Sequence, residues 1–182
     1  MAKSGQMLTN PVTGVQLVFV KTPQDTGGLQ VVHEVTFPPG IGREYPHVHR
    51  LSSEKFEILE GQAAYQLGGK SAEAKAGDVI DFPNGVPHLH PYNHTAEVLK
   101  LRQTITFPTP HMTELTKIDG VLETFFGLSR DGKVNKDGLP SFLQLLVCFG
   151  DLLPELSMPG MPLPVQRVMM SAATVIGAPL GI

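Results

Sequence analysis

The chain has 182 residues, of which 41% are hydrophobic and 17% are charged, and its formal net charge is −3. This length is enough for one domain with an appendage and for a sizeable buried core. A slightly negative chain without a basic stripe lacks the charge pattern of nucleic-acid binding, so we expect no nucleic-acid partner.

Two further features of the sequence bear on its location. The single cysteine, Cys148, excludes a disulfide within the chain and fits a reducing compartment. The N-terminus shows no apolar signal segment, and the longest uncharged run, 168–182, falls short of the roughly 20 residues that span a bilayer. We therefore expect a soluble, cytoplasmic protein with no membrane partner.

The first part of the chain is predicted to form strands. Apolar and polar residues alternate with a period of two in the segments 31–37, 55–58 and 98–105. This alternation is typical of strands with one buried and one wetter face. Turn residues separate the segments, and Gly68-Gly69 suits a two-residue hairpin loop. Short strands at regular intervals indicate a sandwich or a small barrel.

The pattern changes near residue 110, and the second part is predicted to form helices. Apolar residues recur there at helical intervals; Pro154 ends the second helical segment and Pro164 begins the third. We therefore predict a strand domain over 1–109 and a helical extension over 110–182. The predicted helices span 113–127, 141–153 and 165–176.

The helical extension allows three interpretations. Its apolar stripes can pack on the outside of the strand domain, form a dimer contact, or close the barrel mouth as a lid over an apolar ligand. Contact with a membrane surface is disfavoured, because the polar faces of these segments lack the lysine and arginine enrichment of interfacial helices. The sequence leaves the choice among the three open.

Four residues have the spacing and chemistry of a metal site. His47 and His49 are two apart, so both imidazoles leave an extended strand on the same face. Glu54 follows a turn-like segment and can return a carboxylate to the same point, and His88 opens a separate strand. Three nitrogens and one oxygen, with positions left open, characterise a catalytic metal site. Such ligands suit one divalent ion of Fe, Mn, Ni, Cu, Co or Zn per chain.

The spacing of these residues resembles the two motifs of the cupin superfamily. In the first motif the HxH pair, the glutamate and the closing glycine all match, whereas the opening glycine is displaced by one residue. The second motif matches from its glycine to its histidine, and its final asparagine falls one residue late. The matching residues are His47, His49, Glu54 and Gly61 in the first motif, and Gly77, Pro83, Gly85 and His88 in the second; the displaced ones are Gly40 or Gly42, and Asn93.

The resemblance covers about residues 28–107 and implies a fold and a ligand set. The implied fold is all-β, a cupin jelly-roll barrel with a C-terminal α-helical appendage. The implied metal ligands are His47, His49, Glu54 and His88. Both ends of the chain also look like those of small single-cupin proteins with a helical tail. Most of those relatives have no assigned activity, so the finer likeness predicts a fold and not a reaction.

The other histidines have weaker claims to the site. His90 lies two residues after His88 and shares its face on an extended strand, but Pro91 is expected to bend the strand there. The remaining three are interpreted as a core or rim residue, a turn residue and a junction residue: His33, His94 and His111.

Three polar residues outside the ligand set are candidates for the cavity wall. Tyr45, Tyr92 and Gln103 can act as donors or acid–base groups, although a barrel interior also needs ordinary filler. Cys148 lies in an apolar helical segment and is interpreted as an inert buried thiol.

These residues favour a mononuclear metal-dependent enzyme that acts on a small organic molecule in the barrel cavity. Its candidate catalytic residues are Glu54, Tyr45 and His90. A redox metal favours dioxygenase-like chemistry, because imidazole and carboxylate ligands leave positions open. A Lewis-acid metal would instead polarise a carbonyl for isomerisation, cyclisation or C–C cleavage. By resemblance to related sites, Glu54 can also serve as a general base.

A binding module that holds a ligand without converting it is the alternative function. The chain has no room for an effector domain such as a helix-turn-helix, which weakens a regulator but not a simple binder. The edge strands of a jelly roll need cover, and similar cupins usually pair through them, so we expect a homodimer.

Overall fold

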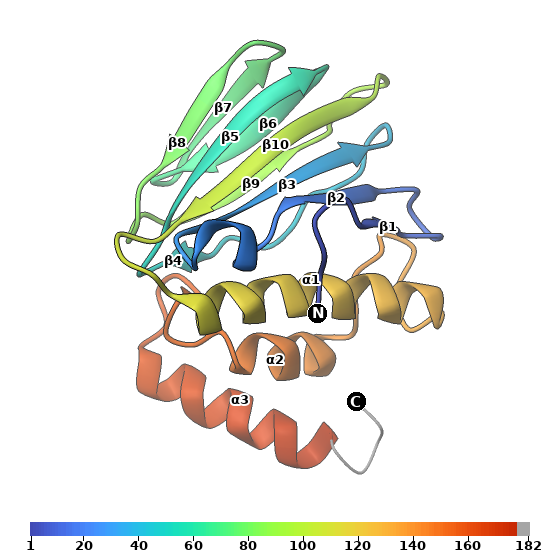
Figure 1. Cartoon of the computed structure of the whole chain (residues 1–182). Coiled ribbons are helices and arrows are strands. Elements are labelled where there is room, and N and C mark those ends of the chain that lie inside the picture. Colours follow the sequence, from blue (N-terminus) through green and yellow to red (C-terminus); the bar gives the residue numbers. More distant parts are fainter. Residues whose placement is uncertain (178–182) are drawn as a thin grey trace.

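The computed structural model describes residues 1–177; residues 178–182, the end of the predicted helical extension, lie outside the described residues. Strands form one part of the molecule and helices pack beneath them (Figure 1). The strands are β1 (Met7–Thr9), β2 (Gln16–Lys21), β3 (Gln30–Phe37), β4 (Val48–His49), β5 (Ser53–Glu60), β6 (Gln62–Leu67), β7 (Lys70–Lys75), β8 (Val79–Phe82), β9 (His88–Tyr92), β10 (Leu99–Thr106) and β11 (Leu156–Ser157). The helices are the short η1 (Gln24–Thr26), α1 (Met112–Arg130), α2 (Phe142–Gly150) and α3 (Leu163–Gly177).

Antiparallel pairing divides the strands into three sheets. The largest has the order β1-β2-β3-β10-β5-β8, the second has the order β7-β6-β9, and β4 pairs with β11. One apolar core joins the two larger sheets, because buried residues of β2, β5 and β10 pack with buried residues of β6 and β7. This arrangement fits the predicted jelly roll. The described strands form separate sheets rather than one closed barrel.

The glycine signals in the sequence act as predicted in two turns. Gly68 and Gly69 both have positive φ and connect β6 to β7, whose register pairs Leu67 with Lys70. Gly61, which closes the first cupin-like motif, has a φ of 80°, and a Cβ there would lie 2.2 Å from the Val98 carbonyl oxygen. Only glycine fits this close approach between β5 and the segment before β10.

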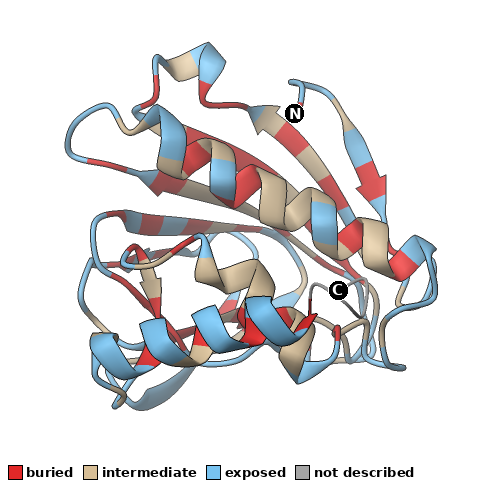
Figure 2. Cartoon of the chain, turned by 90° about the horizontal axis from the view of Figure 1, so that it is seen from below, coloured by how far each residue is buried: buried red, intermediate tan, exposed pale blue. Residues whose placement is uncertain are grey.

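The helices form a layer on the strands, so the all-β description applies only to the part of the chain up to β10. Leu115 and Ile118 of α1 pack against Val31 of β3 and Ile105 of β10. Farther out, α2 contacts α3, and their buried side chains form a separate cluster. Figure 2 shows buried residues recurring along α1 and α3, with exposed residues on their outward sides.

A buried hydrogen-bonded pair fixes α1 to the sheet. Nε2 of His33 in β3 lies 2.9 Å from Oδ1 of Asp119 in α1, and both side chains are almost fully buried. His33 is therefore the hydrogen-bonded core residue that the sequence predicted. Its other ring nitrogen and the second Asp119 oxygen are buried without a hydrogen-bond partner.

The three predicted helices are present, and one small strand was missed. The Oγ atom of Ser141 accepts a hydrogen bond from the Gln144 amide and begins α2, and Pro164 lies in the first turn of α3. Between α2 and α3, β11 pairs with β4, a strand that the sequence did not predict. This pairing brings the helical part of the chain to the strand that carries His49.

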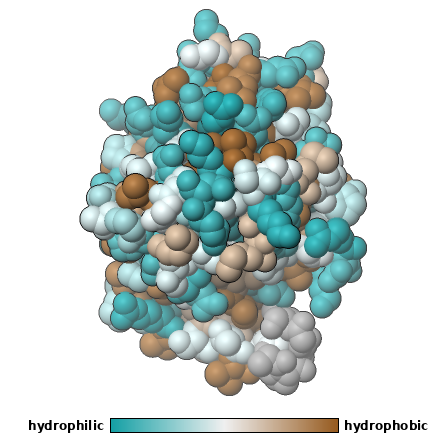
Figure 3. Space-filling view, viewed as in Figure 1, coloured by the Kyte–Doolittle hydropathy of each residue, from teal (hydrophilic) through white to brown (hydrophobic). Residues whose placement is uncertain are grey.

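The surface mixes polar and apolar residues, as the face in Figure 3 shows. Among the described residues, no helix has both the length and the apolar character needed to cross a membrane. The predicted homodimer stays a prediction.

Candidate metal centre

Backbone pairing between two distant segments brings the first imidazoles together. His47 and His88 exchange two backbone hydrogen bonds of 2.9 Å each, so the residue before β4 lies beside the first residue of β9. The ring of His49 lies on the same side, with its centroid 5.1 Å from that of His47. The period-two geometry expected for the two histidines is therefore present. Glu54 approaches the same point from β5.

All three rings are oriented by a hydrogen bond at Nδ1. The acceptors are the carbonyl of Tyr45 for His47 at 3.0 Å, the carbonyl of Val86 for His88 at 2.9 Å, and Oε1 of Glu155 for His49 at 2.8 Å. Carbonyl and carboxylate oxygens only accept, so Nδ1 of each ring carries a proton, and Nε2 is the nitrogen whose lone pair is available when the ring is neutral. Histidines that bind metals in proteins are oriented in this way.

One of these lone pairs has no partner. Nε2 of His88 lies 3.0 Å from Oε2 of Glu54, but the contact lacks hydrogen-bonding geometry. The nitrogen is therefore buried without a hydrogen-bond partner. A buried polar atom in this state costs free energy, and a cation placed between the nitrogen and the carboxylate would satisfy both.

The charge states of Glu54 and His47 suit a cation site. Burial by itself would raise the pKa of Glu54, but attraction to the rings of His49 and His90 outweighs it and holds this pKa well below the ordinary value. Burial and the neighbouring rings of His90 and His49 also hold the pKa of His47 well below its ordinary value. The first group is then a carboxylate and the second a neutral imidazole, which are the forms that bind metals.

His90 also belongs to the cluster, although its claim from the sequence was weaker than that of the four predicted ligands. Its Nε2 lies 3.0 Å from Nε2 of His47 and 2.9 Å from Oε2 of Glu54. β9 continues through Pro91 to Tyr92, but its register with β6 shifts between Leu89 and Tyr92, so the strand is irregular at Pro91 as expected. The irregularity nevertheless leaves the His90 ring beside that of His88, with centroids 5.3 Å apart. The sequence signal for His90 was its position two residues after His88, because side chains two apart on a strand lie on the same face.

A proton on His90 balances the charge of the cluster. Burial lowers the pKa of His90, but Glu54 on one side and Glu44 on the other raise it to about 10. The ring then carries a positive charge against the Glu54 carboxylate at neutral pH. A divalent ion bound by Glu54 would take over this role.

Glu155 is the functional residue that sequence reasoning missed. It lies between α2 and β11, is almost fully buried, and its Oε1 accepts from His49 Nδ1. The backbone amide of Leu51 donates to its Oε2 at 2.7 Å, and the Ser52 hydroxyl also donates to Oε1. Burial raises the pKa of Glu155, but the hydrogen bonds from His49 and Ser52 outweigh it and lower this pKa. A carboxylate behind a ligating histidine fixes the ring and raises its basicity.

The donor set fits a metal ion, and the cluster opens onto a cavity. One ligand atom from each of five residues lies within 4.8 Å of the others: His47, His49, Glu54, His88 and His90. Four of the five line a cavity of about 570 Å³ between the strands and the helices, and the fifth, His88, lies behind them. The geometry therefore places possible metal ligands in the wall of a space large enough for a small organic molecule.

Comparison with known proteins identifies this part of the chain. The family model described as the cupin domain matches residues 33–106. This part of the chain is a cupin domain. No curated protein matches it.

Solved structures resemble this chain at low sequence identity. A predicted oxalate decarboxylase from Thermotoga maritima is 21% identical, with a TM-score of 0.50 over 57% of this chain and 92% of its own. An uncharacterized protein with a double-stranded beta-helix domain from Klebsiella pneumoniae is 20% identical, with a TM-score of 0.44 over 61% of this chain and 85% of its own. The first of these similarities describes the fold alone.

The displaced asparagine of the second cupin motif still fixes the turn that follows β9. Asn93 is buried, and its Nδ2 donates to the carbonyls of Phe37, Pro38 and Glu97 at distances of 3.2, 2.9 and 2.7 Å. A shift of one residue along the sequence is therefore accommodated by the turn itself.

The remaining candidates divide between the cavity and the surface. Gln103 lines the cavity, and its Nε2 donates to Oε1 of Glu54 at 2.7 Å. Tyr45 lines the rim, with its side chain largely exposed, and Tyr92 is half-buried beneath the Arg43 guanidinium. His94 is exposed, as predicted.

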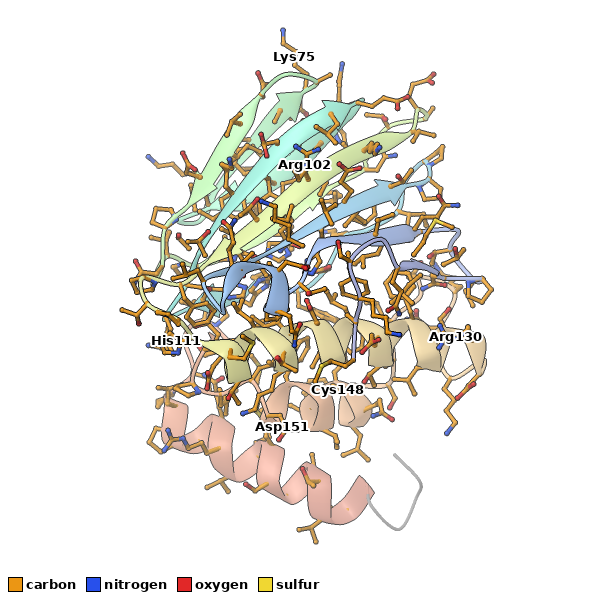
Figure 4. The ribbon with its side chains drawn as sticks, viewed as in Figure 1. Lys75, Arg102, His111, Arg130, Cys148 and Asp151 are labelled. Carbon is orange, nitrogen blue, oxygen red and sulfur yellow. The ribbon has the colours of Figure 1, made fainter. Side chains whose placement is uncertain are left out.

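Cys148 is distant from the cluster. It is half-buried rather than fully buried, and burial raises the pKa of its thiol. Figure 4 shows Cys148 and Asp151 among the helices, away from the strands, and His111 at the start of α1.

Proposed function

We propose that this cupin is a mononuclear metal-dependent enzyme that acts on a small organic molecule, with dioxygenase chemistry as its reaction class. The observation that carries the proposal is the buried histidine and glutamate cluster in the wall of a largely apolar cavity. Perturbed ionisable groups that converge on a cavity are the usual marks of an active site.

The residues have distinct roles in this proposal. Nε2 of His47, His49 and His88 and the carboxylate of Glu54 would hold one divalent ion. When bound, such an ion supplies either redox chemistry with O₂ or Lewis-acid polarisation. Glu155 orients the His49 ring, and Gln103 orients the Glu54 carboxylate.

A dioxygenase reaction needs nothing beyond the substrate and O₂. Both oxygen atoms enter the product and the substrate supplies all four electrons, so no external reductant is consumed. The protein binds the substrate in a space that excludes water, and it keeps the polar groups of the cluster oriented. Mixed imidazole and carboxylate ligands keep Fe(II) accessible to O₂, which supports this class.

One observation favours Lewis-acid chemistry as the second candidate. His90 faces the cavity beside the ligand atoms, with Glu54 at its Nε2 and Glu44 at its Nδ1. An imidazole at this position can give a proton to a substrate, or take one from it, during isomerisation or C–C cleavage. A binder without turnover would make no use of this group.

Metal analysis is the first test. Protein purified without chelator or metal-affinity resin is analysed beside His47→Ala/His88→Ala, with His94→Ala as a matched control that removes an exposed histidine. We expect about one equivalent of metal in the wild type and in the control, and none in the double variant. No stoichiometric metal in any of the three proteins would overturn the proposal.

The identity of the metal then selects the assay. Iron, manganese, copper or nickel would lead to measurements of O₂ consumption with a panel of small organic compounds, whereas zinc would support the Lewis-acid candidate. Glu54→Gln separates an enzyme from a binder, because an enzyme loses turnover disproportionately and a binder loses only affinity.

A further inference from the structure

The cavity beside the cluster is far larger than the space that a metal ion and a water molecule need. Its volume of about 570 Å³ lies within the range of small-molecule sites and is several times the roughly 150 Å³ that accommodates benzene. Protein interiors are otherwise packed with few voids, and an unfilled apolar space forfeits dispersion contacts. A molecule that fills this space would regain those contacts.

The wall opposite the strands is made by the helices outside the matched cupin domain. Leu122 and Phe125 of α1 line it together with Leu145 and Phe149 of α2. On the strand side, Leu17, Val35 and Leu101 complete an apolar lining. The helical layer therefore forms a roof over the cavity, and this roof offers no hydrogen bonds to a ligand.

Most polar residues of the lining lie in two places. The first is the cluster, where His47, His49, Glu54, His90 and Gln103 meet the cavity. The second is the rim, where Arg43, Glu44 and Tyr45 before β4 and Asp137 before α2 are exposed.

Three other polar residues line the cavity, Asn10, Thr13 and Ser157, and the side-chain oxygen of each accepts a hydrogen bond within the protein. Oδ1 of Asn10 accepts from the backbone amides of Val12 and Thr13 and from the Ser129 hydroxyl. The Ser157 hydroxyl accepts from Arg50. A ligand with polar atoms along its body would lose hydration without compensation, whereas an apolar body would not.

From this distribution we propose that the cavity binds an elongated apolar molecule with a single oxygen-bearing end. The polar end lies at the His47, Glu54 and His90 side, and the apolar body lies beneath α1 and α2. The inference rests on the proposed function because it names a substrate class for that site. Its test is a measurement of binding, so its outcome can be distinguished from that of a test of turnover.

Straight-chain saturated carboxylic acids of six to sixteen carbons are suitable probes, measured by calorimetry with the metal-loaded protein. We expect affinity to increase about fourfold for each added methylene while the chain still enters the cavity, and then to level off. We expect glucose, a polar compound of similar size to the shorter acids, not to bind. Affinity that does not change with chain length, or equal binding of glucose, would overturn the inference.

A matched pair of substitutions locates the binding. Val121→Trp fills the roof side of the cavity, whereas Val168→Trp adds the same side chain to an exposed position on α3. We expect the first variant to lose at least tenfold in affinity for dodecanoic acid and the second to bind like the wild type, with metal content unchanged in both. Equal affinity in both variants would overturn the inference while leaving the metal proposal standing.

If Val121→Trp does not fold, Phe149→Leu tests the same point by enlarging the cavity. We expect the chain length at which affinity levels off to increase in this variant. An unchanged length would show that the acids do not lie beneath α2, and would overturn the inference.

Discussion

The strands and the helical layer contribute to the candidate site in different ways. The strands supply the ligand atoms, and nearby residues in the sequence set their positions: His47 and His49 are two apart on one extended segment. The helical layer supplies the Glu155 carboxylate and the apolar roof, and both depend on how that layer packs on the sheet. Local geometry therefore places the ligands, and tertiary packing decides how they are oriented and covered.

Removing a strand-borne ligand is expected to have the largest effect. His49→Ala deletes an Nε2 that faces Glu54, and we expect apparent metal affinity to fall by more than about 100-fold, since removing even the groups behind metal ligands costs 10- to 100-fold. Equilibrium competition with a chromogenic chelator measures this loss. His94→Ala is the control, and a normal affinity in His49→Ala would remove that residue from the ligand set.

The helical contribution is tested by Glu155→Gln. The amide is a weaker acceptor for His49 Nδ1 than the carboxylate, so we expect metal affinity to fall about 10- to 100-fold with the fold retained. Asp151→Asn removes an exposed acid from the same segment and should leave affinity unchanged. If both variants bind metal like the wild type, the helical layer does not influence the metal centre, and the role assigned above to Glu155 is wrong.

The attachment of the helical layer to the sheet is tested at the buried pair of His33 and Asp119. Asp119→Leu leaves His33 buried without its partner, and we expect a loss of about 1–3 kcal/mol in the free energy of unfolding, measured by urea denaturation. The double variant His33→Leu/Asp119→Leu should recover much of this loss, because neither polar group then remains unpaired. A double variant no more stable than Asp119→Leu would contradict this account.

The proton on His90 predicts a pH dependence of metal binding. Its pKa is raised to about 10 by Glu54 and Glu44 despite burial, so the metal-free protein holds this proton at neutral pH. A cation at Glu54 removes the attraction that holds it, so binding releases a proton between the ordinary imidazole pKa of about 6.5 and about 10. Apparent metal affinity should therefore increase with pH in this window, by up to about tenfold per unit.

The raised pKa of His90 also makes the stability of the metal-free protein depend on pH. Because the folded pKa is raised, the contribution of His90 to the stability of the metal-free protein is complete below about pH 6.5 and is lost as the pH rises to about 10. His90→Gln should flatten both dependences, measured by metal titration and urea denaturation across this range. A slope that persists in the variant would assign the released proton to another group.

The sequence predicted the strand part of the site because short-range spacing is sufficient there. Side chains two apart on a strand share a face, so His47 and His49 converge whatever the rest of the chain does. The same rule places His90 on the face of His88, and His90 had a weaker claim from the sequence only because Pro91 was expected to bend the strand. The hairpin at Gly68 and Gly69 and the three helices also follow from local preference.

Only the tertiary structure decided the contributions that join distant segments. Glu155 lies 106 residues from His49, and the β11–β4 pairing that brings them together has no pattern in the sequence. Its one signal was an acid in a segment with few charges, and such an acid needs a partner if it is buried. The choice for the helices between packing and a lid was likewise open, because amphipathic stripes specify that a face is buried and not what it covers. Here the helices pack on the strands and roof the cavity at once, an outcome fixed by the contacts of α1 and α2 with the sheet and with each other.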